Sequence, residues 1–211
     1  MNLRRMAPLI ILVATATLPA QDAFRLDRNH SRIEFNADHI VVLREAEDAE
    51  RDYYAVGATR GHFGNFDIDF VPGADGFAGS RITATIQAAS LDTENAPRDA
   101  HLKSDDFLDV VDYPTITFRS TAFEKVATDT FRVTGDLTIR DITRPVALTA
   151  VVQGKTRDAG GNAYISFQAA GRIDRTAFGL TWDELLEQGA FRVSKYIELT
   201  IQGNFIEVSS R

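Results

Sequence analysis

An all-β fold is predicted for this chain of 211 residues. Hydrophobic and polar residues alternate over several stretches, as in strands with one buried and one solvated face. Glycine and proline separate these stretches, which is typical of tight turns between antiparallel strands. Because no long amphipathic helix is available to cover a sheet, roughly eight or nine strands must pack as two sheets or close into a barrel. Alternation alone leaves both architectures open.

The predicted strands follow one another along most of the chain. In residues 65–70, Phe66, Ile68 and Phe70 share one face, while asparagine and aspartate share the other. The same alternation is found in residues 81–88, 131–139, 146–152 and 197–202. Turns are expected at Pro72-Gly73, Asp75-Gly76, Gly154 and Gly160-Gly161. Each strand therefore has a wet face and a dry face.

Residues 1–20 have the pattern of a secretory signal peptide. Arg4 and Arg5 precede an apolar run at 7–18, and the small residue Ala20 stands before a polar stretch. This run is shorter than the about 20 residues of a membrane-spanning helix. We therefore expect residues 21–211 to form one domain, periplasmic or secreted, without a membrane span. The alternative is that residues 1–20 stay attached as an anchor.

The composition argues against several classes of partner and chemistry. With 30 acidic and 23 basic residues, the net charge is −7, and no basic cluster offsets it. Such a surface repels nucleic acid, so we expect no nucleic-acid partner. The chain has no cysteine, which excludes disulfides, thiol catalysis and thiolate metal sites.

Phenylalanine is the dominant aromatic residue, with 14 copies against five tyrosines and one tryptophan. Its side chain supplies apolar area without a hydroxyl group that needs a partner. Dry faces rich in phenylalanine suit a lumen that holds a ligand without polar groups along its length. A core filled by these side chains is equally compatible with the periodicity.

No catalytic or metal motif is evident. Asp67 and Asp69 lie on the wet side of a strand, and no GxSxG sequence is present. The histidines lack the spacing of an HExxH site, and they are His30, His39, His62 and His101. His39 has the strand parity of Phe35 and is the one inward-facing candidate for acid or base chemistry. We expect a protein that is not an enzyme and has no metal or cofactor.

Several blocks, in order, carry a resemblance to a known family. They are SLDTENAPRDAHLKSDDFLDVVDYPTITF at 90–118, HSRIEF followed by His39, GHFGNFDIDF, VTGDLTIRDITRPVALTA and FGLTWDELLEQG. Together they extend from about Phe24 to Phe205. The chain resembles the YceI-like family, whose members are periplasmic or secreted lipocalin-like barrels that bind long-chain isoprenoids and similar amphiphilic lipids.

The resemblance implies an eight-stranded antiparallel lipocalin-like barrel with one or two short helices. It also implies non-catalytic binding, sequestration or transport of a long-chain isoprenoid or other amphiphilic lipid in an apolar lumen. Family members often pair, so a homodimer is a further expectation. The alternatives are a stress-linked structural or interaction module with a filled barrel, and an enzyme that acts on a bound lipid.

Strand parity and the resemblance together suggest a set of ligand-binding residues. The residues expected to line the tunnel are Phe35, Phe66, Ile68, Phe70, Ile82, Ile86, Phe118, Phe131, Val133, Leu137, Phe178 and Trp182. Trp182 either closes one barrel end as core or forms part of the tunnel wall. In the short helix implied at the barrel edge, Arg98, His101 and Lys103 are candidates for the lipid head group. The alternative is that they only stabilise their own turn.

The sequence departs from the family pattern at residues 41–58. This acidic insertion carries Tyr53 and Tyr54 and is expected to form a loop or short helix. It is either a solvated surface excursion or a lid over the barrel mouth.

Overall fold

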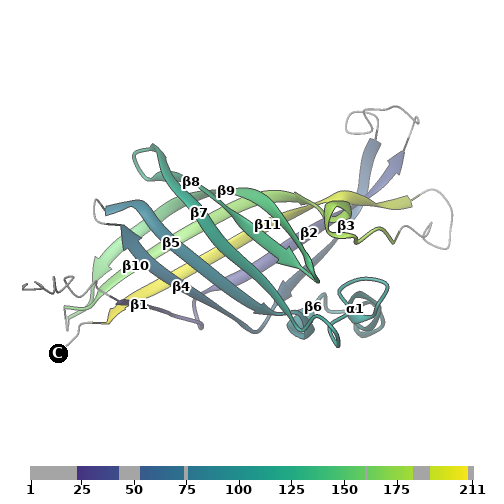
Figure 1. The fold of residues 1–211 in the computed structure, drawn as a ribbon, viewed down its shortest axis with the longest axis horizontal. Coiled ribbons are helices and arrows are strands. Elements are labelled where there is room, and N and C mark those ends of the chain that lie inside the picture. Colours follow the sequence, from purple (N-terminus) through teal and green to yellow (C-terminus); the bar gives the residue numbers. More distant parts are fainter. Residues whose placement is uncertain (1–22, 43–52, 74–75, 160, 183–190, 209–211) are drawn as a thin grey trace, which may run out of the picture.

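The computed structural model describes residues 23–42, 53–73, 76–159, 161–182 and 191–208, and these form an antiparallel barrel (Figure 1). The strands are β1 (Ala23–Leu26), β2 (Arg32–Val42), β3 (Tyr53–Phe63), β4 (Phe66–Gly73), β5 (Gly76–Gln87), β6 (Leu91–Asp92), β7 (Thr115–Ala127), β8 (Thr130–Ile139), β9 (Ile142–Arg157), β10 (Ala163–Asp174) and β11 (Phe191–Val208).

The barrel closes because β11 is long enough to pair with both β1 and β2. β1 pairs with β11 through Leu26 and Phe205, and β2 continues along the same strand from Arg32 opposite Gln202. The ring β1-β4-β5-β7-β8-β9-β10-β11 therefore returns to β1 and has eight strands. At the other end of β11, β2 is followed by β3 and then β6.

Closure of the sheet decides between the two architectures that alternation left open. The predicted eight-stranded antiparallel barrel is confirmed. The predicted faces are also found: along β8, Phe131, Val133, Leu137 and Ile139 are buried, whereas Arg132 is exposed. These strands place a nearly continuous apolar surface inside the ring.

The helices are short. One α-helix, α1 (Ala96–Lys103), and the 3-10 helices η1 (Ala88–Ser90) and η2 (Arg175–Phe178) lie in the described ranges. Asn95 begins α1 because its side chain accepts a hydrogen bond from the backbone N–H of Arg98, and a proline occupies the first turn. None of these described helices has the length and apolar character needed to cross a bilayer. α1 lies at one end of the barrel, and the C-terminal end of β11 lies at the other (Figure 1).

Part of the insertion at 41–58 is strand, which corrects the expected loop or short helix. Val41 and Val42 end β2, and residues 53–58 begin β3. Tyr53 pairs with Val42, and Tyr54 pairs with Val41, so both tyrosines belong to a β-ladder. Residues 43–52 lie outside the described residues, and so do residues 1–20. The lid and the signal peptide stay predictions.

One glycine makes room for an aromatic ring inside the barrel. Gly135 lies on the dry face of β8, next to the ring of Phe118 on β7. A Cβ atom at this position would lie 2.6 Å from Cε2 of Phe118 and 2.6 Å from the carbonyl oxygen of Arg119. The missing side chain leaves the space that the Phe118 ring occupies.

We expect Gly135→Ala to destabilise the barrel by about 1–3 kcal/mol, because the added methyl group overpacks the Phe118 ring and an adjacent backbone atom. Urea unfolding followed by circular dichroism measures the change. Gly154→Ala is the matched control, since a Cβ atom there meets nothing within 4 Å. Equal stability of the two variants would contradict this account.

Candidate functional site: an apolar cavity inside the barrel

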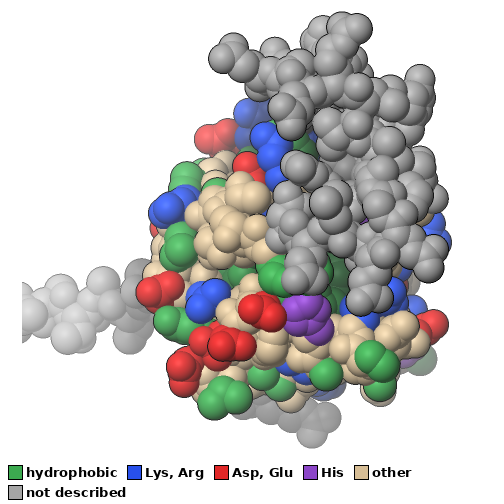
Figure 2. Space-filling view, turned by 90° about the vertical axis from the view of Figure 1, so that its right-hand side faces the viewer, with side chains coloured by type: hydrophobic (Ala, Val, Ile, Leu, Met, Phe, Trp, Pro, Cys, Tyr) green, Lys and Arg blue, Asp and Glu red, His purple; other side chains and the backbone are tan. Residues whose placement is uncertain are grey.

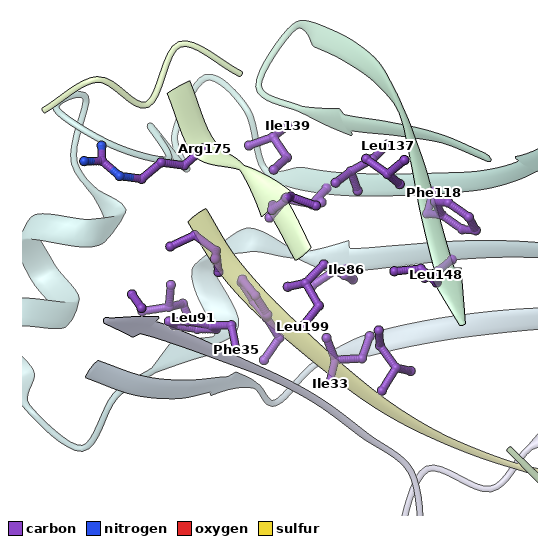
Figure 3. Close-up of a pocket in the computed structure, with 18 of the residues that line it drawn as sticks. Ile33, Phe35, Ile86, Leu91, Phe118, Leu137, Ile139, Leu148, Arg175 and Leu199 are labelled. Carbon is purple, nitrogen blue, oxygen red and sulfur yellow. The ribbon is translucent and has the colours of Figure 1, made fainter. Parts of the chain in front are cut away.

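The dry faces of the strands enclose a cavity of about 400 Å³. Pockets that hold small molecules typically measure about 300–1,000 Å³. The wall is almost entirely aliphatic and aromatic, with residues such as Ile33, Phe118 and Leu199 converging from different strands (Figure 3). The interior is therefore hollow, which argues against the barrel filled by its own side chains.

The structure brings together most of the residues predicted to line the tunnel. Those that line the cavity are Phe35, Ile68, Ile82, Ile86, Phe118, Val133, Leu137 and Trp182. Those that do not line it are Phe66, Phe70, Phe131 and Phe178, all of them buried. Phe66, Phe70 and Phe131 have the expected inward strand parity but pack outside the void, and Phe178 belongs to η2.

The wall also contains residues that the prediction did not select. Ile139 on β8 and Leu199 and Ile201 on β11 line the cavity, and their positions in the alternating pattern already placed them on the dry face. Leu102, Phe107 and Leu108 come from α1 and the segment after it. No periodic signal marks that group, because a loop folding over a barrel end follows no fixed repeat.

Polar side chains line the cavity only at the α1 end, among the described residues. On β2 and β3, Nε2 of His39 lies 3.1 Å from Oγ1 of Thr59. His39 pairs with Val193, whose carbonyl oxygen accepts a hydrogen bond from Arg175. Arg98 and His101 of α1 complete the group. The cavity thus has a polar end and an apolar bore.

Three aromatic rings close together form part of this end. The ring of His101 lies 4.7 Å from that of Trp182 and 5.2 Å from that of Phe107, and Phe107 lies 5.2 Å from Trp182. Nε2 of His101 is 3.1 Å from a carboxylate oxygen of Asp106. Seen from the α1 end, acidic side chains lie beside a histidine and hydrophobic side chains (Figure 2). Trp182 therefore contributes to the cavity wall at the α1 end.

The head-group candidates lie in different places. Arg98 lines the cavity, and its Nε and one terminal nitrogen donate to the hydroxyl and carbonyl oxygens of Thr93, at 2.8 and 2.9 Å. Asp99 accepts from the same hydroxyl, so this turn is stabilised by its own side chains. His101 lines the cavity, and Lys103 does not.

Arg175 is the buried cation of this end and was not predicted. Only 5% of its surface is exposed. Its guanidinium donates to the carbonyl oxygens of Ser194 at 3.0 Å, Trp182 at 3.1 Å and Val193 at 3.2 Å, and also to that of Leu180. These bonds fasten residues 180–182 to β11 across the barrel end.

Asp174, the residue before Arg175, stabilises the turn that places Arg175 at this end of the barrel. Burial raises the pKa of Asp174, but the hydroxyl and backbone N–H of Thr176 donate to its carboxylate at 2.6 and 2.9 Å and lower the pKa below its usual value. A charged Asp174 thus begins η2, and the left-handed Gly179 ends it.

A cluster of phenylalanines occupies the opposite end of the barrel. The ring of Phe70 lies 5.3 Å from those of Phe167 and Phe205, and 5.7 Å from that of Phe24. Phe77 lies 4.9 Å from Phe167. Such tilted and edge-on pairs add to the stabilisation from burial. Of these rings, Phe167 and Phe205 line the apolar end of the cavity, and the others pack behind them.

A model of the YceI-like domain matches residues 24–205. The chain belongs to the YceI-like family. A UPF0312 protein of Pectobacterium carotovorum is 33% identical over 170 residues, 81% of either chain. Protein YceI of Escherichia coli is 38% identical over 123 residues, which are 58% of this chain and 64% of that one. The predicted family membership is confirmed.

Solved structures of YceI-like proteins share the barrel. The Campylobacter jejuni YceI protein is 26% identical, with a TM-score of 0.65, covering 79% of this chain and 98% of that one. A polyisoprenoid binding domain from Saccharophagus degradans, implicated in plant cell wall breakdown, is 13% identical with a TM-score of 0.59. That comparison covers 89% of this chain and all of that one, and at this identity it shows the fold alone.

Proposed function

We propose that this YceI-like protein binds a long-chain isoprenoid or another amphiphilic lipid in its cavity and sequesters or carries it without changing it. The apolar tail lies in the bore, and the head group lies at the α1 end. The observation that carries the proposal is the separation of the wall into an apolar bore and a polar end. An amphiphile with one head and one tail matches this separation.

The energetics favour a long tail. Each methylene moved from water into an apolar site contributes about 0.8 kcal/mol. Several buried methylenes therefore offset the cost of association and of ordering the chain. Arg98 and His101 are the head-group residues we propose, because both line the polar end. Lys103 is a weaker candidate because it lies outside the lining.

A non-catalytic role is the simpler assignment. Among the described lining residues, the titratable side chains are His39, Arg98, His101 and Arg175, and no carboxylate is included. His39 hydrogen-bonds Thr59, and Arg175 donates to backbone carbonyl oxygens. No group of three His, Asp or Glu side chains in the described chain is arranged to hold a metal ion. We also propose export to the periplasm or the medium, where a carrier would meet membrane lipids.

Native mass spectrometry of the protein purified from its own host tests the proposal. We expect a fraction of the protein to carry one additional mass that organic extraction releases as a lipid. Delipidated protein should regain a one-to-one complex with added prenyl alcohol, accompanied by a change in Trp182 emission. Protein without any bound mass, before or after this addition, would refute lipid binding.

A further inference from the structure

We propose that the phenylalanine cluster at the β1 end is a fixed stop that determines the longest tail the cavity accepts. This inference rests on the proposed lipid-binding function and names the residues that set its specificity. Phe167 and Phe205 form the floor of the bore, and Phe70, Phe77 and Phe131 pack behind them.

On two strands of the barrel, β4 and β8, the cavity ends before the inward-facing row of side chains does. On β4, Ile68 lines the cavity, but Phe70, two residues further on, does not. On β8, Val133 lines it and Phe131 does not. Because residues two apart share a face, the inward row continues past the end of the void on both strands. What ends the void is the size of the side chains at that level.

The floor consists of two rings that face the cavity. Phe167 on β10 and Phe205 on β11 both line the cavity, and both are buried. Their ring centres lie 6.2 Å apart. On β10, the next inward residue beyond Phe167 is Ile165, which is buried and does not line the cavity. A tail that reaches this level meets ring surface.

The rings behind the floor prevent it from yielding. Phe77 lies 4.9 Å from Phe167 and 5.8 Å from Phe131, and Phe70 contacts both floor rings at 5.3 Å. Only 2% of the surface of Phe70 is exposed. A side chain packed on several sides has few alternative rotamers, so the stop is rigid.

The outer side of the cluster faces water. The ammonium group of Lys155, an exposed residue of β9, lies 4.1 Å from the centre of the Phe77 ring. A cation over an aromatic face is stabilising, and it marks the boundary between the packed rings and solvent. The cluster therefore separates the bore from solvent and leaves the α1 end as the entrance.

A tail-length series tests the stop, with farnesol, geranylgeraniol and geranylfarnesol, which differ by one isoprene unit each, as probes and Trp182 emission as the readout. For wild-type protein, affinity should rise by about fourfold for each buried methylene and stop rising once the tail reaches the floor. In Phe167→Ala the maximum should move to a longer alcohol. The first alcohol beyond the wild-type maximum should gain about tenfold in affinity.

Two further variants distinguish a change in the longest accepted tail from a loss of folding stability. Ala169→Phe puts a ring one inward position above the floor and should move the maximum to a shorter alcohol. Phe178→Ala removes a ring that is 1% exposed, lies outside the lining and belongs to η2. This control should lose stability as Phe167→Ala does but keep the wild-type maximum.

The outcomes distinguish the stop from the binding function. If wild-type protein binds none of the alcohols, the proposed function fails. If wild-type protein binds them and folded Phe167→Ala and Ala169→Phe both keep its maximum, the stop is refuted while lipid binding stands. Should Phe167→Ala not fold, Ala169→Phe alone decides, because an unmoved maximum in that variant overturns the inference.

Discussion

Replacing Ala84 with phenylalanine is expected to weaken the binding of a long-tailed lipid by about 100-fold. Ala84 is buried on β5, lines the cavity and pairs with Ile68 and Phe118, which also line it. A ring at this position obstructs the bore partway along. If it excludes about four methylenes at about 0.8 kcal/mol each, the loss is about 3 kcal/mol.

Isothermal titration of delipidated protein with geranylgeraniol measures this effect. Thr85→Phe is the matched control, because Thr85 follows directly on the same strand and pairs with Asp67 and Thr117 on the outer face. It should bind as the wild type does. Since the Ala84→Phe ring enters an existing void, the variant without lipid should keep its melting temperature. Unchanged affinity in a folded Ala84→Phe protein would show that the lipid lies elsewhere.

Truncation of Arg175 to alanine is expected to have the largest effect on stability. The change removes the donors to four carbonyl oxygens, which belong to Leu180, Trp182, Val193 and Ser194. A buried acceptor without a partner costs about 1–3 kcal/mol. Since water reaches some of these oxygens once the side chain is gone, we expect a total loss of about 3 kcal/mol. For a domain of this size, the melting temperature should fall by about 6–12 °C.

Differential scanning calorimetry of Arg175→Ala and Arg172→Ala tests this role. Arg172 lies three positions earlier, is exposed, and has its guanidinium 4.1 Å from the centre of the Tyr196 ring. An exposed cation–π contact contributes about 0.5–1 kcal/mol, so this control should lose no more than about 4 °C. A comparable loss in both variants would mean that the carbonyl contacts of Arg175 are not what holds the barrel end.

The sequence predicted the strands and their faces because alternation is a local property. Along β4, Phe66, Ile68 and Phe70 point inward as expected. Alternation could not predict ring closure, since sandwiches and barrels share the period. Closure depends on β11 pairing with β1 at one end and β2 at the other. The family resemblance supplied this long-range information.

Depth along the bore could not be predicted, and this explains the uneven outcome for the lining residues. Ile68 and Phe70 have the same parity, yet only Ile68 lines the void. Which level a residue occupies follows from the tilt and stagger of all the strands. Arg175 gave no signal either. Its carbonyl partners come from residues 180–182 and 193–194, which only the folded chain brings to it.

The proposed stop at the phenylalanine cluster has a consequence for how a bound lipid would be exchanged. With the entrance we propose at the α1 end, a lipid would enter and leave through the same end of the barrel, so a molecule that enters tail first would leave head first. Handover from one membrane to another would then require the whole protein to turn and present its α1 end to donor and recipient in succession. Each transfer between membranes would then move one lipid molecule per protein molecule.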